Sequence, residues 1–195
     1  MPEIIWKNAK SMDAGFPCAP LPPGAEKIFI PKNNMAVSLV FALPLAALLF
    51  WALWGRACAS PGRPLEPWCI PFGVFAGILL IPLHEWLHAA IYPKNAEAYI
   101  GLIPKQFMAY AHCAAPLSKK RFILMCLLPM ILGLLPFLLF LICPLNWPGA
   151  AAVLWPCAMV GLVSPSPDYL NVFLVCRAER RFDTKRQGRP ILVLP

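Results

Sequence analysis

The stretch PLHEWLH, residues 82–88, lies inside a run that otherwise has the composition of a membrane-spanning helix. From Ile70 to Tyr92 the sequence reads IPFGVFAGILLIPLHEWLHAAIY. The chain has only three histidines, and two of them fall in this turn together with a glutamate. Polar side chains inside a bilayer lose roughly several kcal/mol of hydration unless they find partners there, so we expect this turn to have a function.

The composition of the whole chain is that of a membrane protein. Of its 195 residues, 59% are hydrophobic and only 13% are charged, whereas a soluble domain is roughly half apolar and a quarter charged. Eight cysteines are scattered along the chain without a CxxC pair, which argues against a disulfide framework and against a cysteine zinc cluster. We interpret them as small core or lipid-facing residues.

Four apolar segments are long enough to cross a membrane as helices. The fourth is interrupted by SPSPD at 164–168. The sequence therefore predicts an all-α polytopic membrane protein with about four transmembrane helices. The four segments are Met35–Leu53, Pro71–Tyr92, Phe122–Cys143 and Ala150–Cys176.

The loop between the second and third segments is unusually apolar. AYIGLI at 98–103 and FMAYAH at 107–112 flank the residues Pro-Lys-Gln at 104–106. Two short apolar and aromatic runs around a turn that contains proline are typical of a β-hairpin. We expect a short membrane-associated hairpin here. The alternative is an ordinary amphipathic loop.

The basic residues predict the orientation in the membrane. With four spans, all 17 lysines and arginines except Arg56 and Arg63 lie on one side. The positive-inside rule places that side, and both termini, in the cytoplasm, and it explains the net charge of +8 without nucleic acid. We divide the chain into a cytoplasmic N-terminal segment (1–34), a transmembrane domain that contains the HEWLH turn (35–176) and a basic cytoplasmic tail (177–195).

His84, Glu85 and His88 form an HExxH motif. On a helix, positions i and i+4 share one face, so both imidazoles can bind one metal ion. The glutamate between them can act as general base on a zinc-activated water that attacks an amide carbonyl. The alternative is a polar patch that hydrogen-bonds neighbouring helices.

A catalytic zinc ion usually has three protein ligands, so the motif needs a third. At 1.5 Å per residue, His84 and His88 lie about 15 and 9 Å along the helix from Lys94 at the cytoplasmic flank. Asp168 lies about 13 Å from Arg177 by the same rule, at a similar depth. The candidates are Asp168, His112, Glu97 and Glu179.

Asp168 is the candidate that its surroundings favour. Pro165 and Pro167 should break the fourth helix, and a broken helix is tolerated in a bilayer where it faces protein or a wet cavity. Asp168 would then begin the half-helix that follows, with its carboxylate towards the motif. The alternative is a plain N-cap aspartate, which leaves His112 as the second choice.

Three stretches of this sequence resemble known proteins. LHEWLHA at 83–89, APLSKKRFILMCLLP at 115–129 and SPSPDYLN at 164–171 are similar to a family of small four-span bacterial membrane proteins described as zincin peptidases. The arrangement also resembles the site-2 proteases, which are intramembrane zinc metalloproteases. The likeness covers roughly residues 70–175.

The resemblance implies one zinc ion per chain, held by His84, His88 and Asp168, with Glu85 as the catalytic acid and base. Site-2 proteases typically carry Asn-Pro-x-Asp-Gly around the third ligand, where this chain has Ser-Pro-Ser-Pro-Asp-Tyr. Asn171 follows the aspartate by three residues and is the candidate to replace the missing amide near the oxyanion or the substrate.

These observations predict a zinc-dependent intramembrane or membrane-proximal peptidase of the bacterial cytoplasmic membrane. Its partners would be the lipid bilayer and a membrane-protein or peptide substrate, which the 98–112 hairpin could bind by adding a strand. The alternative is a catalytically inactive membrane protein with a structural or regulatory zinc site. A metal transporter fits less well, because the apolar 35–53 segment offers no polar path.

Overall fold

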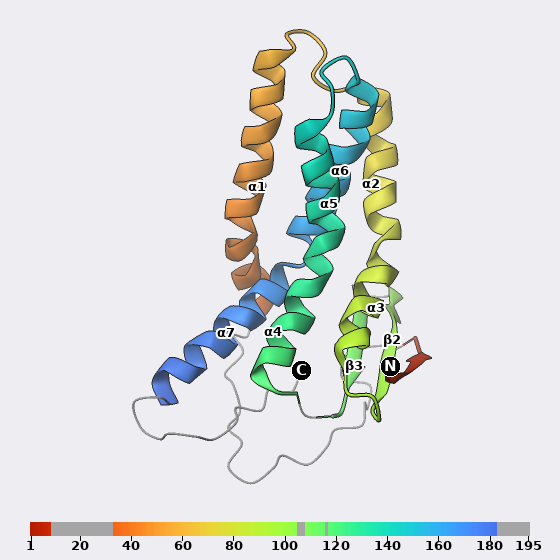
Figure 1. Ribbon diagram of the computed structural model, residues 1–195, viewed down its shortest axis with the longest axis vertical. Helices are drawn as coiled ribbons and strands as arrows, with labels where there is room; N and C mark the ends of the chain where they lie inside the picture. The colour runs from red at the N-terminus through yellow and green to blue at the C-terminus, as the bar shows by residue number, and fades with distance from the viewer. Residues whose placement is uncertain (9–32, 105–107, 116, 183–195) are drawn as a thin grey trace. The chain divides into compact units, whose positions relative to one another are not determined.

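The computed structural model describes residues 1–8, 33–104, 108–115 and 117–182. The described chain is mostly helical, with a small sheet (Figure 1). Its elements are β1 (Glu3–Trp6), α1 (Asn34–Ala59), the short 3-10 helix η1 (Pro67–Cys69), α2 (Ile70–Leu79), α3 (Ile81–Ile91), β2 (Glu97–Ile103), β3 (Met108–Cys113), α4 (Lys119–Leu127), the 3-10 turn η3 (Leu128–Met130), α5 (Ile131–Ile142), α6 (Pro148–Val163) and α7 (Ser166–Phe182).

Four helical segments of the described chain are long and apolar enough to cross a membrane, as the sequence predicted. Three of them are not single helices: α2 continues into α3, α4 into α5 and α6 into α7, each after a short irregular turn. The four segments are Ala36–Ala59, Pro67–Ile91, Lys119–Ile142 and Pro148–Arg177.

The chain folds into two compact units that alternate along the sequence. We call Asn33–Ile81 with Met130–Tyr169 the helix unit, and Met1–Lys32, Pro82–Pro129 and Leu170–Pro195 the sheet unit. The chain passes from one unit to the other between Lys32 and Asn33, and then once inside each of the three interrupted spans, at or near a proline.

In the helix unit, α6 packs against α1, α2 and α5 through small residues. A Cβ added to Gly133 of α5 would lie 2.4 Å from the carbonyl carbon of Gly161, and one added to Gly77 of α2 would lie 2.6 Å from Val160. Only glycine permits such close helix contacts, which is the usual packing in membranes. The buried core beside them consists of Leu49, Phe137, Ala158 and Leu162.

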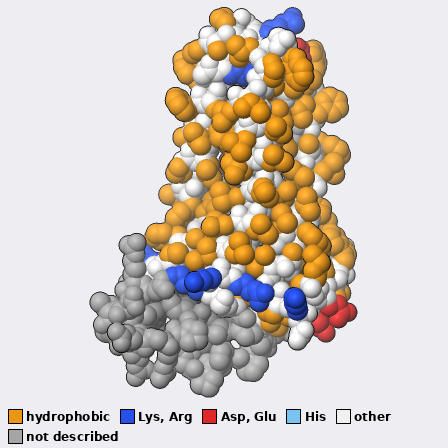
Figure 2. All heavy atoms as spheres, viewed as in Figure 1, with side chains coloured by type: hydrophobic (Ala, Val, Ile, Leu, Met, Phe, Trp, Pro, Cys, Tyr) orange, Lys and Arg blue, Asp and Glu red, His pale blue; other side chains and the backbone are white. Residues whose placement is uncertain are grey.

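The outer surface of the helix unit is apolar. Large side chains such as Trp51, Phe72 and Ile142 are 72%, 67% and 77% exposed. Figure 2 shows hydrophobic side chains spread over α1 and α5 on the visible face. Such a surface is compatible with a bundle of membrane-crossing helices.

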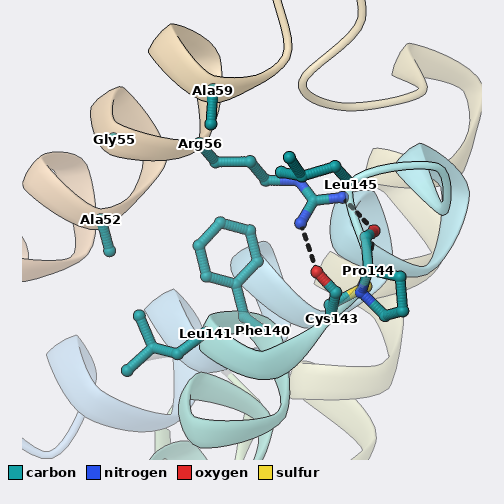
Figure 3. A pocket seen from close by; sticks show the side chains of 9 residues that line it. All are labelled: Ala52, Gly55, Arg56, Ala59, Phe140, Leu141, Cys143, Pro144 and Leu145. Atoms are coloured by element: carbon teal, nitrogen blue, oxygen red, sulfur yellow. Dashed lines mark hydrogen bonds between the residues drawn. The ribbon is translucent and has the colours of Figure 1, made fainter.

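Arg56 connects two loops of the helix unit. It lies in the last turn of α1, and its guanidinium donates a hydrogen bond to the carbonyl of Pro64. It also donates to the carbonyls of Cys143 and Pro144 (Figure 3). The distribution of basic residues in the sequence groups Arg56 with Arg63 as a charged loop residue. In the structure it is buried, with only 7% of its surface exposed.

The sheet unit contains the predicted hairpin and one strand more. β2 pairs antiparallel with β3, with Ala98 opposite Cys113, and the turn residues 105–107 lie outside the described part of the chain. β1, from the N-terminal segment, adds parallel to the other edge of β2, so the strand order is β1-β2-β3. Gly101 permits this contact, because a Cβ there would lie 2.2 Å from the Lys7 carbonyl oxygen.

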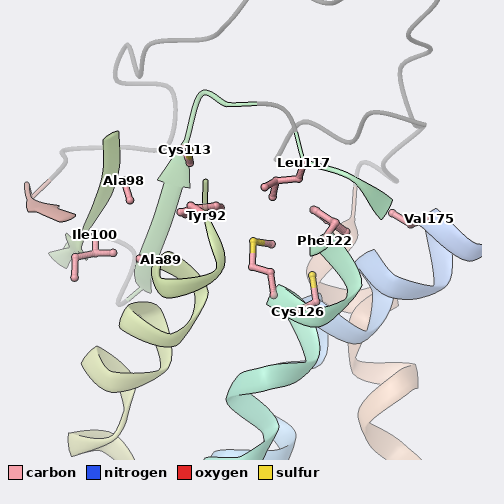
Figure 4. Packing of buried hydrophobic residues seen from close by; sticks show 10 residues of the cluster. Ala89, Tyr92, Ala98, Ile100, Cys113, Leu117, Phe122, Cys126 and Val175 are labelled. Atoms are coloured by element: carbon pink, nitrogen blue, oxygen red, sulfur yellow. The ribbon is translucent and has the colours of Figure 1, made fainter. Parts of the chain in front are cut away.

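One face of the hairpin belongs to the hydrophobic core of the sheet unit. Ala98 and Ile100 of β2 pack with Tyr92, which follows α3, and with Phe122 and Cys126 of α4 (Figure 4). Ala98 and Ile100 are buried while Glu97 and Tyr99 are not, as expected of a strand with one covered face, and the alternation ends at Gly101, which is also buried. This packing against protein explains the apolar sequence of the loop.

Candidate metal centre

The first part of the site is the histidine pair of α3. His84 and His88 lie one helical turn apart, and their Nε2 atoms are 3.0 Å from each other. The rings meet edge to face, with centroids 4.6 Å apart and planes at 85°. Two imidazole nitrogens therefore point at one region of space, as the i, i+4 spacing requires.

A backbone carbonyl of α4 orients the second imidazole. Nδ1 of His88 lies 2.9 Å from the carbonyl oxygen of Met125, and His88 is only 6% exposed. A carbonyl only accepts hydrogen bonds, so Nδ1 carries the hydrogen and donates it. The lone pair of a neutral His88 then lies on Nε2, which is the nitrogen that faces His84.

Pro129 explains why this carbonyl is available. In a regular helix the Met125 carbonyl would accept from the N–H four residues later, but proline has no N–H. α4 ends at Leu127, and Leu128 donates to the carbonyl of Leu124. This contact between His88 and Met125 was not predicted from the sequence. The only signal in the sequence is the proline four residues after Met125, which indicates a carbonyl without a helical donor but does not identify His88 as the donor.

Two prolines make the break between α6 and α7. Pro165 and Pro167 lack the N–H groups that would continue α6 beyond Val163. Two hydroxyls donate to carbonyls in the last turn of α6: Tyr169 donates to the Leu162 carbonyl at 2.7 Å, and Ser164 donates to the Val160 carbonyl at 2.7 Å. The predicted break in the fourth segment is therefore present, between Val163 and Ser166.

Asp168 lies in the first turn of the helix that follows the break. Ser166, two residues earlier, is buried and shares a hydrogen bond with Ser38 of α1, with 3.3 Å between the two hydroxyl oxygens. The border between the two units falls between Tyr169 and Leu170, inside α7. α7 is one continuous helix, so it carries both Asp168 and the residues of the sheet unit that begin at Leu170.

His84, His88 and Asp168 form the one group of three possible metal ligands in the described chain. One ligand atom from each lies within 4.8 Å of the others. Tetrahedral zinc at about 2.0–2.1 Å from its ligands holds them roughly 3.3 Å apart, close to the spacing of the two imidazole nitrogens. Two imidazoles and a carboxylate are also the donor set of a catalytic zinc site with an open fourth position. These residues fit a zinc ion.

The other candidates for a third ligand lie elsewhere. His112 is opposite Tyr99 in the hairpin, and Glu97 accepts a hydrogen bond from the Tyr99 hydroxyl. Neither belongs to the ligand group, and the side chain of Glu179 lies outside the described residues. Burial raises the pKa of the thiol of Cys113, the neighbour of His112.

Two further side chains lie beside the ligands in sequence. Glu85 follows His84 on α3 and is half-buried. Asn171 lies one turn after Asp168 on α7 and is also half-buried. Residues three or four apart on a helix share a face, so Asn171 lies on the side of α7 that carries Asp168. Their chemical roles stay predictions.

Comparison with known proteins gives one family. A family model described as "Putative zincin peptidase" matches residues 77–182, which is more than half of the chain and contains α3, the hairpin, α4 and α7. No curated protein and no solved structure matches the chain.

Proposed function

Since this chain belongs to the zincin peptidase family, we propose that it is a zinc-dependent peptidase whose metal ligands are His84, His88 and Asp168. The observation that carries the proposal is the convergence of these three side chains within 4.8 Å. A bound zinc ion would supply Lewis-acid activation of a water molecule and of the scissile carbonyl.

Glu85 is the proposed general base. It accepts a proton from the attacking water and returns it to the leaving amine, so the peptide bond breaks with one water consumed. Its half-buried position beside His84 supports this role. Asn171 is the proposed donor to the negative charge that develops on the carbonyl oxygen.

The proposed substrate is a membrane-protein segment or a peptide at the membrane. Four apolar helical segments support a place in the cell membrane, and the distribution of basic residues supports cytoplasmic termini. A helical substrate hides its amides in internal hydrogen bonds, so it must be extended before cleavage. β3 is an edge strand of the sheet, and we propose that an extended substrate adds to it.

A structural or regulatory zinc site is the second candidate function. The ligand group alone supports it equally, because three ligands bind zinc with or without catalysis. The glutamate next to His84 favours the enzyme, since a structural site has no use for a base there.

The substitution Glu85→Gln separates the two functions. We expect the variant to keep its zinc and to lose roughly 100-fold or more of the rate at which a reconstituted single-span peptide or labelled casein is cleaved. Glu97→Gln, an exposed glutamate of the hairpin outside the ligand group, is the matched control and should keep the wild-type rate. Equal cleavage by wild type and Glu85→Gln would contradict the proposed base.

A further inference from the structure

Arg56 of the helix unit is a buried arginine at the end of α1. Its Nε donates to the Pro64 carbonyl at 2.9 Å, and its terminal nitrogens donate to the Cys143 and Pro144 carbonyls at 2.8 Å each. The arginine thus joins the segment after α1 to the segment after α5. A guanidinium has five N–H groups, so these three hydrogen bonds leave two hydrogens for another acceptor.

The charge of Arg56 has no anionic partner within the described ranges. Its three acceptors are neutral carbonyls, and its remaining contact is the ring of Phe140, with the centroid 5.7 Å from Cζ. In the loop after α1, the Glu66 carboxylate lies 4.0 Å from Arg63. A buried charge without a counter-charge is unfavourable, so this position favours an anion.

A cavity of about 340 Å³ lies beside the guanidinium. One wall is a single face of α1 made of Ala52, Gly55 and Ala59, and the opposite wall includes Leu141 and Leu145 (Figure 3). A Cβ added to Gly55 would meet no atom within 4 Å, so the space reaches the backbone of α1. The cavity therefore combines one cation with apolar walls, and its volume is that of a small-ligand site.

We propose that this cavity binds the phosphate group of a membrane phospholipid. Arg56 would donate charge-assisted hydrogen bonds to the phosphate oxygens, and the start of an acyl chain would lie against Ala52 and Leu141. Arg56 is three residues from the end of the 24-residue segment Ala36–Ala59, where a spanning helix reaches the head groups. The inference rests on the apolar spans and is independent of the peptidase.

The test compares the full-length wild type with Arg56→Gln and Arg63→Gln in the same detergent. Each protein receives phosphatidylglycerol, diacylglycerol with the same chains, or inorganic phosphate, and its unfolding temperature is measured. We expect phosphatidylglycerol alone to raise the unfolding temperature of wild type and Arg63→Gln by several degrees. Arg56→Gln should lose this shift.

A second variant, Gly55→Leu, tests the same cavity in case Arg56→Gln does not fold. The leucine fills the cavity but leaves the three hydrogen bonds of Arg56 in place, so the variant should fold and lose the response to phosphatidylglycerol. No response in the wild type, or an undiminished response in Gly55→Leu, would overturn the proposal. An equal shift with inorganic phosphate would assign the cavity to a free anion and overturn the lipid assignment.

Discussion

The first and the fourth apolar spans treat proline differently. α1 contains Pro44 and still runs as one helix from Asn34 to Ala59, whereas α6 and α7 are separated at residues 164–165. One proline removes one N–H, and the turns on either side hold the helix together. Pro165 and Pro167 remove two N–H groups within three positions, and the helix ends.

Polar side chains cluster at the break between α6 and α7, and they do not cluster in the continuous helix α1. Within six residues the break carries Ser164, Ser166, Asp168 and Tyr169, and the hydroxyls of Ser164 and Tyr169 donate to carbonyls of α6. In α1 the described buried polar side chains are Ser38 and Arg56, far apart along the helix. A break thus supplies the polar surroundings in which a carboxylate can lie in an apolar span.

Removing the break between α6 and α7 should have the largest effect on zinc affinity. In the double variant Pro165→Ala/Pro167→Ala, α6 can continue and turn Asp168 away from the histidines. We expect zinc affinity, measured by competition with a chelator, to fall by roughly 100-fold or more. Pro44→Ala removes a proline from α1 and should leave the affinity unchanged. If both variants bind zinc as wild type does, the break does not position the aspartate.

The second break, at Pro129, should have an intermediate effect. Pro129→Ala supplies an N–H that competes with His88 for the Met125 carbonyl, and a ligand that loses its orienting partner binds metal roughly 10- to 100-fold more weakly. The spectrum of the cobalt-substituted protein should change as well, since the imidazole is reoriented. An unchanged affinity and spectrum would show that the carbonyl does not orient His88.

The smallest effect should come from single hydroxyls at the break. Tyr169→Phe leaves the Leu162 carbonyl without its hydroxyl donor, which should cost about 1–3 kcal/mol and lower the unfolding temperature by several degrees. Ser164→Ala removes a hydroxyl from a carbonyl that also accepts the Ser164 backbone N–H, so it should be nearly neutral. Equal shifts in the two variants would contradict this account.

Much of the fold follows from local sequence. Apolar length identifies the four spans, a proline pair predicts the break before Asp168, and two short runs around a turn predict the hairpin. The i, i+4 spacing places His84 and His88 on one face, and the distance along the helix from the basic flanking residues brings Asp168 into consideration. These features depend on residues close together in the chain.

The features that the sequence could not predict are contacts between distant residues. β1 is a four-residue strand whose partner β2 begins more than ninety residues later, and no local pattern specifies such a pairing. The acceptor of His88 is a backbone carbonyl, which any residue type could supply. Arg56 is buried by three carbonyls from other segments, which its position among loop charges does not indicate.

The central claim is that His84, His88 and Asp168 hold one zinc ion, and metal content tests it most directly. Wild type, His88→Ala, Asp168→Ala and the control Glu97→Ala would be purified in detergent with zinc supplied, and zinc per chain would be measured. We predict about one zinc in wild type and Glu97→Ala, and almost none in the two ligand variants. Zinc lost only in His88→Ala would contradict the role of Asp168, and no zinc in wild type would contradict the metal site itself.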